Sequence, residues 1–337
     1  MFLFSRSALV KTVVDHIVYL NGSSLDALGV SMVDLVPILE EIFHQKADGQ
    51  TIMPPKIFFH RQGSRFYSSM VSCAPKLGYA GAKWQSGDPQ NPSRGLPYIQ
   101  GLYVMSEDAT GQPVAIIDAK WITAQRTAAA SALVAKYLAR DGAEVLAILG
   151  CGLQGRRHLE ALKGVVPGLI RCQAFDIDPE REALFVREMS GKFGVEVVGA
   201  GGPQAAVRGA DVVVTAGPIE EKRNPTILPE WIAPGALVVA IDYDSYVTDA
   251  AIAAMDIVVT DDREQIHDAR RNEGKFTGVH RIDADLAELV RHGTGRRQSG
   301  DQRILAFNLG IALEDIATAA ELLKRAREQN IGMQLPR

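Results

Sequence analysis

A glycine-rich segment stands directly between a short apolar run and a helical pattern. Residues 145–149 read VLAIL, residues 150–155 read GCGLQG, and the residues after them read RRHLEALKG. In a strand–turn–helix of this kind, the first glycine permits a tight turn and the second lets the backbone approach a pyrophosphate. The third lets helix and strand pack closely. The sequence therefore predicts a dinucleotide-binding α/β fold. The cofactor site is expected to include Gly150, Cys151, Gly152, Leu153, Gln154 and Gly155.

An acidic residue follows the glycines at the distance that such a fold requires. Asp176 ends the next strand-like run, about 20 residues further on. Its carboxylate can accept hydrogen bonds from a ribose 2′-hydroxyl and would repel a 2′-phosphate, which favours NAD(H) over NADP(H). Asp178 competes for this role, although an aspartate before a proline is more typical of a helix N-cap. Thr215 and Ala216, at the end of a later strand-like run, complete the predicted cofactor-binding set.

The second half of the chain alternates short apolar runs with helical or loop segments. The runs lie at 145–149, 170–175, 195–198, 212–215, 237–241 and 257–260. Apolar strands that alternate with helices indicate a parallel sheet covered on both faces. Helices are predicted over 123–140, before this region, and over 309–329, after it.

The first part of the chain has a different pattern, in which helical and strand-like segments are mixed. A helix is predicted over 31–47, and strand-like runs lie at 56–60, 102–106 and 114–118, with turn signals between them. This mixture indicates an α+β unit. The full length of 337 residues fits about two domains, and we expect the C-terminal helix to return to the first of them.

Composition excludes several classes of protein. The chain has 36 Lys+Arg against 40 Asp+Glu, a net charge of -4 and 47% hydrophobic residues. These values are typical of a folded domain and give no electrostatic reason to expect a nucleic acid or an anionic membrane as partner. Arg6, Lys11 and Asp15 interrupt the apolar start of the chain, and no run reaches the roughly 18 apolar residues of a membrane helix. We expect a soluble protein.

Cysteine and histidine usage argues against disulfides and metal. Cys73, Cys151 and Cys172 are odd in number, widely spaced and without a CxxC pair, so a cytoplasmic location is expected. The histidines form no metal-spaced cluster, and no metal site is expected.

Basic residues without acidic neighbours mark a candidate substrate site. The segment 56–84 contains no Asp or Glu, and both Lys56 and Lys83 stand there among small or apolar residues. For these two lysines a structural and a functional role are both open on composition alone. Arg126 lies inside the Ala-rich helix, where a guanidinium is costly to bury without a carboxylate or phosphate partner. Other basic residues of the segment are interpreted as a solvated sheet face: Arg61, Arg65 and Lys76.

Two carboxylates, Asp242 and Asp244, follow the run 237–241. They would stand at the carboxyl end of a parallel strand, the edge at which open α/β sheets bind ligands. A carboxylate there can relay a proton or position an ammonium or imine, or it can cap the next helix.

Taken together, these segments resemble the ornithine cyclodeaminase/mu-crystallin family. The similarity includes MPPK at 53–56, GAKW at 81–84, RTAAASA at 126–132, GCGLQG at 150–155, DIDP at 176–179 and GIALED at 310–315. It covers nearly the whole chain in the same order. The resemblance implies an α+β substrate-binding and dimerisation domain made of residues 1–125 and 305–337, a Rossmann dinucleotide-binding domain of residues 126–304, and a homodimer.

The resemblance also implies how a substrate is held. Lys56, Lys83 and Arg126 would bind the carboxylate of an amino or imino acid, and Leu309 and Gly310 would close the pocket. Two residues would be catalytic. Lys83 would assist proton transfer at the C–N centre, and Asp244, which matches the family aspartate, would act as base or position the amine.

Two departures from the family pattern bear on the reaction. The family often has a Gly-Lys pair after its aspartate, where this chain has residues 245–247, SYV. Ornithine cyclodeaminases place a glutamate before the equivalent of Met70, where this chain has residues 67–69, YSS. A cationic substrate side chain would then meet an electropositive pocket, so cyclodeamination of ornithine or lysine is disfavoured. The same pocket suits a substrate with a second carboxylate.

The leading hypothesis is therefore an NAD-dependent imine reductase or amino-acid dehydrogenase that transfers hydride at a C–N bond next to a carboxylate. The alternatives are an ornithine- or lysine-type cyclodeaminase that keeps NAD bound and releases ammonia, and a non-catalytic binding protein similar to mu-crystallin.

Overall fold

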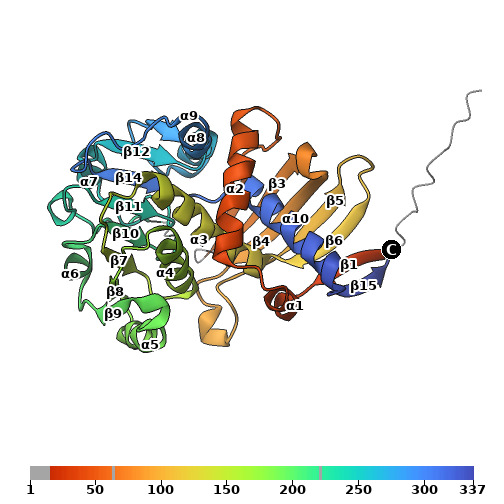
Figure 1. The fold of residues 1–337 in the computed structure, drawn as a ribbon, viewed down its shortest axis with the longest axis horizontal. Coiled ribbons are helices and arrows are strands. Elements are labelled where there is room, and N and C mark those ends of the chain that lie inside the picture. Colours follow the sequence, from red (N-terminus) through yellow and green to blue (C-terminus); the bar gives the residue numbers. More distant parts are fainter. Residues whose placement is uncertain (1–15, 63–64, 220–221) are drawn as a thin grey trace, which may run out of the picture.

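The chain folds around two β-sheets that lie side by side (Figure 1). The computed structural model describes residues 16–62, 65–219 and 222–337. The charged residues that interrupt the apolar start, Arg6, Lys11 and Asp15, lie outside these described residues.

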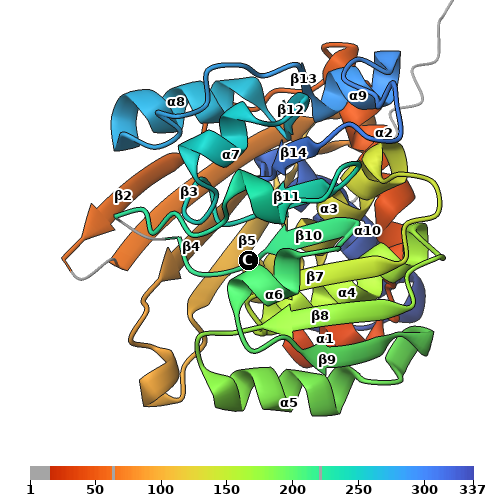
Figure 2. The ribbon, with the colours of Figure 1, turned by 90° about the vertical axis from the view of Figure 1, so that its left-hand side faces the viewer.

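The larger sheet has eight strands in the order β13-β12-β14-β11-β10-β7-β8-β9, and all of its pairings are parallel (Figure 2). Its strands are β7 (Val145–Leu149), β8 (Arg171–Phe175), β9 (Glu196–Gly199), β10 (Val212–Thr215), β11 (Leu237–Ala240), β12 (Ile257–Thr260), β13 (Ala284–Asp285) and β14 (Ile304–Phe307). Within β10, Val212 and Val214 pack into one apolar cluster and Val213 into another, so both faces of the sheet are buried. This confirms the predicted parallel Rossmann-type sheet. Sequence reasoning missed β14, because it is only four residues long and stands between a polar loop and the segment 308–311.

The helices that connect these strands are α4 (Leu153–Val165), α5 (Pro179–Met189), α6 (Pro203–Val207), α7 (Asp249–Ala253), α8 (Arg263–Glu273) and α9 (Leu286–His292). Because every strand of the sheet runs in the same direction, the loops that leave β7, β10, β11, β12 and β14 all meet at one edge.

The second sheet has seven strands in the order β15-β1-β6-β5-β4-β3-β2. Its strands are β1 (His16–Leu20), β2 (Ile57–Arg61), β3 (Arg65–Ala74), β4 (Tyr79–Gly87), β5 (Ile99–Glu107), β6 (Pro113–Asp118) and β15 (Met333–Pro336). The C-terminal strand β15 pairs with β1, so the C-terminal segment returns to the first sheet as expected. Strands β3 and β4 were not predicted, because serine, glycine and alanine give them little of the β-branched signal by which strands are found.

Helices α2 (Met32–Ala47), α3 (Ala119–Leu138) and α10 (Ala312–Gln329) pack against one another, with the short α1 (Gly22–Ala27) nearby, and α3 and α10 cover β3, β4 and β5 (Figure 1). Helix α3 also contacts α4 and β11 of the larger sheet, so it is buried on nearly all sides. Its many alanines permit this close packing. Helix α10 begins at Ala312 and not at residue 309, because Gly310 has a φ of 78° that a helix does not accept.

The predicted domain boundaries fall inside elements of the structure. The boundary at 125/126 lies within α3, and that at 304/305 lies within β14, which pairs with β11 and β12. Residues 304–307 thus belong to the larger sheet, and the division into two domains otherwise stays a prediction. Within the described ranges, no helix combines the length and the apolar character that crossing a membrane requires.

Candidate active site

The glycine loop has the geometry that its sequence predicts. Gly150 follows β7 with a φ of 109°, and a Cβ there would lie 2.4 Å from the carbonyl oxygen of Ala216. A Cβ on Gly155 would lie 2.4 Å from the carbonyl oxygen of Gly150. The first glycine therefore brings the ends of β7 and β10 together, and the third lets α4 start against the loop.

The start of α4 is open to a ligand. Gly152 is its N-cap residue, no side chain caps the helix, and no atom lies within 4 Å of the position where a Cβ would stand. The first N–H groups of a helix need partners and attract anions. The loop therefore fits the pyrophosphate of a dinucleotide.

Asp176 lies half-buried directly after β8 and is bonded to the glycine loop. Its Oδ2 accepts a hydrogen bond from the backbone N–H of Cys151 at 2.8 Å, and its Oδ1 accepts one from the N–H of Asp178 at 3.0 Å. Asp178 instead caps α5, accepting from the N–H groups of Glu180 and Arg181. The geometry favours Asp176 as the carboxylate beside the cofactor, and Asp178 as the cap.

Replacing Asp176→Ser together with Ile177→Arg is expected to move the coenzyme preference toward NADP(H). The substitution removes the carboxylate that repels a 2′-phosphate, and Ile177, 89% exposed, offers a position for a guanidinium that binds one. The ratio of kcat/KM for NADPH and NADH measures the change, with Ile177→Arg alone as the matched control. An unchanged kcat/KM ratio in the double variant would show that Asp176 does not contact the ribose.

The predicted substrate-binding cations come together between α3, α10 and β4. In the seven-stranded sheet Lys83 pairs with Met70 and Tyr103, and these three side chains are buried beneath α3 and α10. The next residue, Trp84, points to the opposite face and is 51% exposed. Arg126 reaches the same place from α3 and is 4% exposed.

Two acids that sequence reasoning missed stand among these cations. Asp315 Oδ1 accepts hydrogen bonds from Lys83 Nζ at 2.8 Å and from Arg126 Nε at 3.1 Å. Glu314 Oε2 accepts one from Arg126 Nη1 at 2.8 Å. Both acids are fully buried in the first turn of α10. The signal that could have found them is an adjacent acid pair inside the otherwise apolar segment 309–320.

The residues expected to close the pocket lie against the same cations. Gly310 contacts Arg126 so closely that a Cβ would lie 2.1 Å from Nη1, and its N–H donates to Asp261 Oδ2 at 2.6 Å. The carbonyl of Leu309 accepts from Lys56 Nζ at 3.0 Å, and the Lys56 ammonium stands 4.8 Å above the ring of Tyr243. The structure thus adds Asp261, at the carboxyl end of β12, to the cluster.

Burial controls the protonation of this cluster. It lowers the pKa of Lys83 to about 8, with the charges of Arg126 and Lys56 acting in the same direction and Asp315 opposing them. Burial also lowers the pKa of Lys56 to about 8, against the attraction of Asp261. Arg126 stays charged, since Asp315 and Glu314 outweigh burial and raise its pKa. A lysine with a pKa near neutrality suits proton transfer.

A short chain of contacts joins the cation cluster to the glycine loop. Lys83 Nζ donates to Thr123 Oγ1 at 3.3 Å, and the carbonyl of Thr123 accepts from Gln154 Nε2 at 3.4 Å. Gln154 belongs to the predicted cofactor loop. The two predicted binding sites are therefore neighbours through a single residue of α3.

Asp242 and Asp244 face different surroundings. Asp242 is buried after β11 and accepts from Thr215 Oγ1 at 2.7 Å and from the N–H of Gly217 at 3.0 Å, and burial raises its pKa to about 7. The carboxylate of Asp244 accepts from the N–H of Phe276 at 2.7 Å and pairs with Arg223 at 3.2 Å. Asp242 therefore lies with Thr215 at the edge of the larger sheet where the cofactor is predicted to bind. Asp244 is held by one residue that precedes it in the chain, Arg223, and by one that follows it, Phe276.

The remaining basic residues of the segment 56–84 are exposed, in agreement with their interpretation as a solvated face: Arg61, Arg65 and Lys76. Among the residues that the structure places, no group of three or more His, Cys, Asp or Glu side chains could hold a metal ion.

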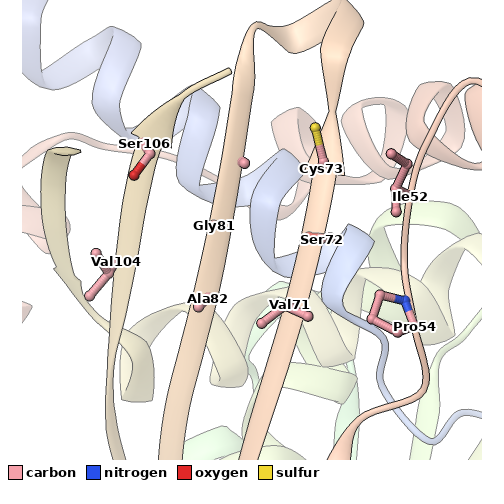
Figure 3. A pocket seen from close by; sticks show the side chains of 10 residues that line it. Ile52, Pro54, Val71, Ser72, Cys73, Gly81, Ala82, Val104 and Ser106 are labelled. Atoms are coloured by element: carbon pink, nitrogen blue, oxygen red, sulfur yellow. The ribbon is translucent and has the colours of Figure 1, made fainter. Parts of the chain in front are cut away.

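A shallow hollow of about 490 Å³ lies on the outer face of the seven-stranded sheet, turned away from the cations (Figure 3). Val71, Ala82 and Val104 are paired neighbours on β3, β4 and β5 and form its floor. Among the placed residues, none with a charged side chain lines the hollow, so its chemistry suits apolar contact.

Comparison with known proteins shows similarity over nearly the whole chain. Residues 25–330 match the model of the ornithine cyclodeaminase/mu-crystallin family. The alanine dehydrogenase of Archaeoglobus fulgidus is 32% identical, with 91% of this chain and 94% of that protein aligned. The structure of Thermococcus litoralis Δ1-pyrroline-2-carboxylate reductase with NADH and L-proline superposes with a TM-score of 0.85 at 27% identity, over 95% of this chain and 100% of that one. An archaeal alanine dehydrogenase dimer with bound NAD superposes with a TM-score of 0.83 at 29% identity, over 95% and 99%.

Proposed function

The chain belongs to the ornithine cyclodeaminase/mu-crystallin family and is an NAD-dependent oxidoreductase acting on CH–NH or C=N groups; we propose that its substrate is an α-amino acid or the corresponding α-imino acid. The observation that carries the proposal is the cluster of half-buried Lys56 with buried Lys83 and Arg126 beside the glycine loop.

The cluster offers donors to one carboxylate. Among the described residues, no hydrogen bond engages Nη2 of Arg126, and Lys56 Nζ uses one of its three protons on Leu309. A carboxylate bound there has its neighbouring carbon held next to the loop edge where the cofactor binds. Such positioning supplies a large part of the rate in a hydride transfer.

The structure removes the basis for the expected second carboxylate. That expectation depended on an electropositive pocket, but Asp261, Glu314 and Asp315 stand against the three cations. Because the three acids offset the charges of the three cations, the site lacks the net positive charge that a second anion would need. We therefore propose a substrate with a single carboxylate at this cluster.

Proton transfer at nitrogen is assigned to Lys83. Its pKa, lowered to about 8 by burial, lets it exist in both protonation states near neutral pH. Asp244 was the second predicted catalytic residue. Phe276 and Arg223 contact only its Oδ2, and its Oδ1 is buried and accepts no hydrogen bond from any described residue. Both carboxyl oxygens of Asp242, by contrast, are bonded, to Thr215 and Gly217. We therefore propose Asp244 as the second proton carrier.

The cofactor is held by the glycine loop, the start of α4 and Asp176, with Thr215 and Ala216 at the neighbouring strand end. NAD(H), when bound, accepts or supplies the hydride. The chain's own part is to bind the carboxylate, to exclude water from Lys83 and Arg126, and to hold the proton that moves to or from nitrogen.

Stoichiometry distinguishes a reductase or dehydrogenase from a cyclodeaminase. We expect L-alanine, L-proline or Δ1-pyrroline-2-carboxylate to change NADH absorbance in proportion to product formed. L-Ornithine is expected to give neither ammonia nor a net change in NADH absorbance. The inward side chains of β3 near the cluster are Ser68, Met70 and Ser72, and none of them is an acid that could bind its distal ammonium. Ammonia release from L-ornithine without net NADH would establish the cyclodeaminase instead.

We propose that the homodimer forms through the outer face of the seven-stranded sheet. Phe59, Trp84, Leu102 and Val104 on this face are 42–51% exposed, and Phe59, Tyr67 and Trp84 stack on one another. Large contiguous apolar patches are uncommon on monomers. A related archaeal alanine dehydrogenase is a dimer.

Trp84→Glu is expected to raise the dimer dissociation constant by about a hundredfold or more, because a charge would be buried against apolar partners. Sedimentation velocity over a range of protein concentrations measures the change. Val33→Glu, at an exposed apolar position on α2, is the matched control and should leave the dimer intact. A dimer that is unaffected by Trp84→Glu would place the interface elsewhere.

A further inference from the structure

The two carboxyl oxygens of Glu314 stand in different situations. Oε2 accepts a hydrogen bond from Arg126 Nη1 at 2.8 Å, whereas Oε1 is buried and accepts none from any residue that the structure describes. A buried, charged oxygen without a donor is costly. A proton on Oε1 removes the charge that makes this burial costly and turns the oxygen into a donor, while Oε2 keeps its bond to Arg126. Asp315 Oδ2 is likewise buried without a donor among the described residues, but Oδ1 of that acid accepts from both Lys83 and Arg126, so its ionised form is better stabilised than that of Glu314.

The charges around Glu314 come from five parts of the chain. Arg126 faces it from α3, Asp261 from the end of β12, and Asp315 from α10 itself. Lys56, ahead of β2, is close enough for the charge of Glu314 to act on it. Lys83 reaches the group through its ion pair with Asp315.

Charge balance decides what this cluster can bind. If Asp261, Glu314 and Asp315 are all ionised, they cancel Lys56, Lys83 and Arg126, and a bound carboxylate leaves a net negative charge in a buried place. Buried charges are stable only when they are paired. One proton on the acids leaves these six groups with one net positive charge, which matches one carboxylate. Glu273, whose charge also acts on Lys56, faces His60 at 3.6 Å.

We propose that Glu314 holds a proton on Oε1 at neutral pH, and that this proton makes the cluster receptive to the single carboxylate of the substrate. The inference rests on the proposed function, since it takes the ligand to be a carboxylate. Glu314 is then a positioning residue. It orients Arg126 without cancelling its charge.

The environment of Glu314 supports the assignment. Burial raises its pKa to about 8, and Asp261 and Asp315 act in the same direction, against Arg126. At pH values below this pKa, Oε1 of Glu314 carries its proton. As pH rises through it, the proton leaves and a carboxylate ligand must bring one back, so affinity is lost on the alkaline side.

The test is carboxylate binding to the NADH-loaded protein at pH 7 and pH 9. Pyrrole-2-carboxylate is a suitable probe because it is planar, ionised at both values and resistant to reduction. Calorimetry in two buffers of different ionisation enthalpy gives both the Kd and the protons taken up. For the wild type we expect about tenfold weaker binding at pH 9, with about one proton taken up there and little at pH 7.

Glu314→Gln is the decisive variant, because an amide resembles the protonated acid in shape and offers a donor where Oε1–H stands. It should lose less affinity for the probe than the wild type between pH 7 and pH 9 and take up about one proton fewer at pH 9. The lysines of the cluster titrate in the same range, since burial lowers the pKa of Lys56 and of Lys83 to about 8. If Glu314→Gln loses affinity at pH 9 as the wild type does, a lysine is the titrating group and the proposal is overturned.

Infrared spectroscopy gives a readout that does not need a ligand. The NADH-loaded wild type should show a protonated carboxyl band of Glu314 that disappears between pH 7 and pH 9 and is absent from Glu314→Gln, beside the band of Asp242, whose pKa burial raises to about 7 and which both proteins share. Glu321→Gln, at a partly exposed position on the same helix, should keep the band. Absence of the band from the wild type, or equal binding by the wild type at both pH values, would overturn the proton assignment. A wild type that shows the band but binds no carboxylate would contradict the proposed function.

Discussion

Replacing Lys83 by methionine is expected to lower kcat by about 10²- to 10⁴-fold, the usual contribution of a positioned proton donor or acceptor. Lys83 is fully buried, so water cannot take over its proton transfer. Methionine has a similar length and no charge, and Asp315 keeps its second partner, Arg126. Steady-state kinetics with an imino acid and NADH, together with the Kd for NADH from fluorescence, measure the effect.

The Kd for NADH should stay within about twofold in this variant, because Lys83 contacts Thr123 and Asp315 and not the glycine loop itself. Lys76→Met is the matched control, since Lys76 is exposed in the turn between β3 and β4. A Lys83→Met protein that turns over normally would remove Lys83 from the chemistry. A parallel loss of NADH binding would indicate a wider structural effect.

Arg126→Lys is expected to raise the substrate KM by about a hundredfold while the melting temperature changes little. The substitution keeps the positive charge opposite Glu314 and Asp315, so no buried acid is left alone. Lysine cannot satisfy both acids and still present a planar pair of N–H groups to a carboxylate. Losing one or two charge-assisted hydrogen bonds, each about 1.5–3 kcal/mol, accounts for the expected change.

Arg325→Lys provides the comparison for Arg126→Lys. Arg325 also bridges two acids, Asp34 and Glu321, but it lies at the surface between α2 and α10. Its substitution should leave KM unchanged. An unchanged KM in Arg126→Lys would show that the substrate carboxylate is held elsewhere.

Much of the fold could be predicted because its signals are local. The glycines at 150–155 need only the strand before them and the helix after them, and the apolar runs of the parallel sheet stand out over four to six residues. Asp176 and the cap at Asp178 were distinguishable because each role depends on its neighbours within a few positions. The missed strands β3 and β4 are rich in serine, glycine and alanine, which carry little strand preference of their own, and β14 has only four residues after a polar loop.

The candidate site was only half visible in the sequence. Arg126 was expected to have a buried anionic partner, and that partner was sought in a substrate. The structure provides two within the chain, Glu314 and Asp315, which lie 188 and 189 residues further along. No pattern of spacing connects residues so far apart.

The sequence by itself determined the chemistry that is available: a glycine loop for a dinucleotide, an acid for its ribose, and a set of cations for a carboxylate. Only the tertiary structure decided how those cations are charged and what they can hold. The physical reason is that a charge inside a protein depends on burial and on partners within a few ångströms. For Lys83 the nearest such partner, Asp315, is 232 residues away in the chain and 2.8 Å away in space.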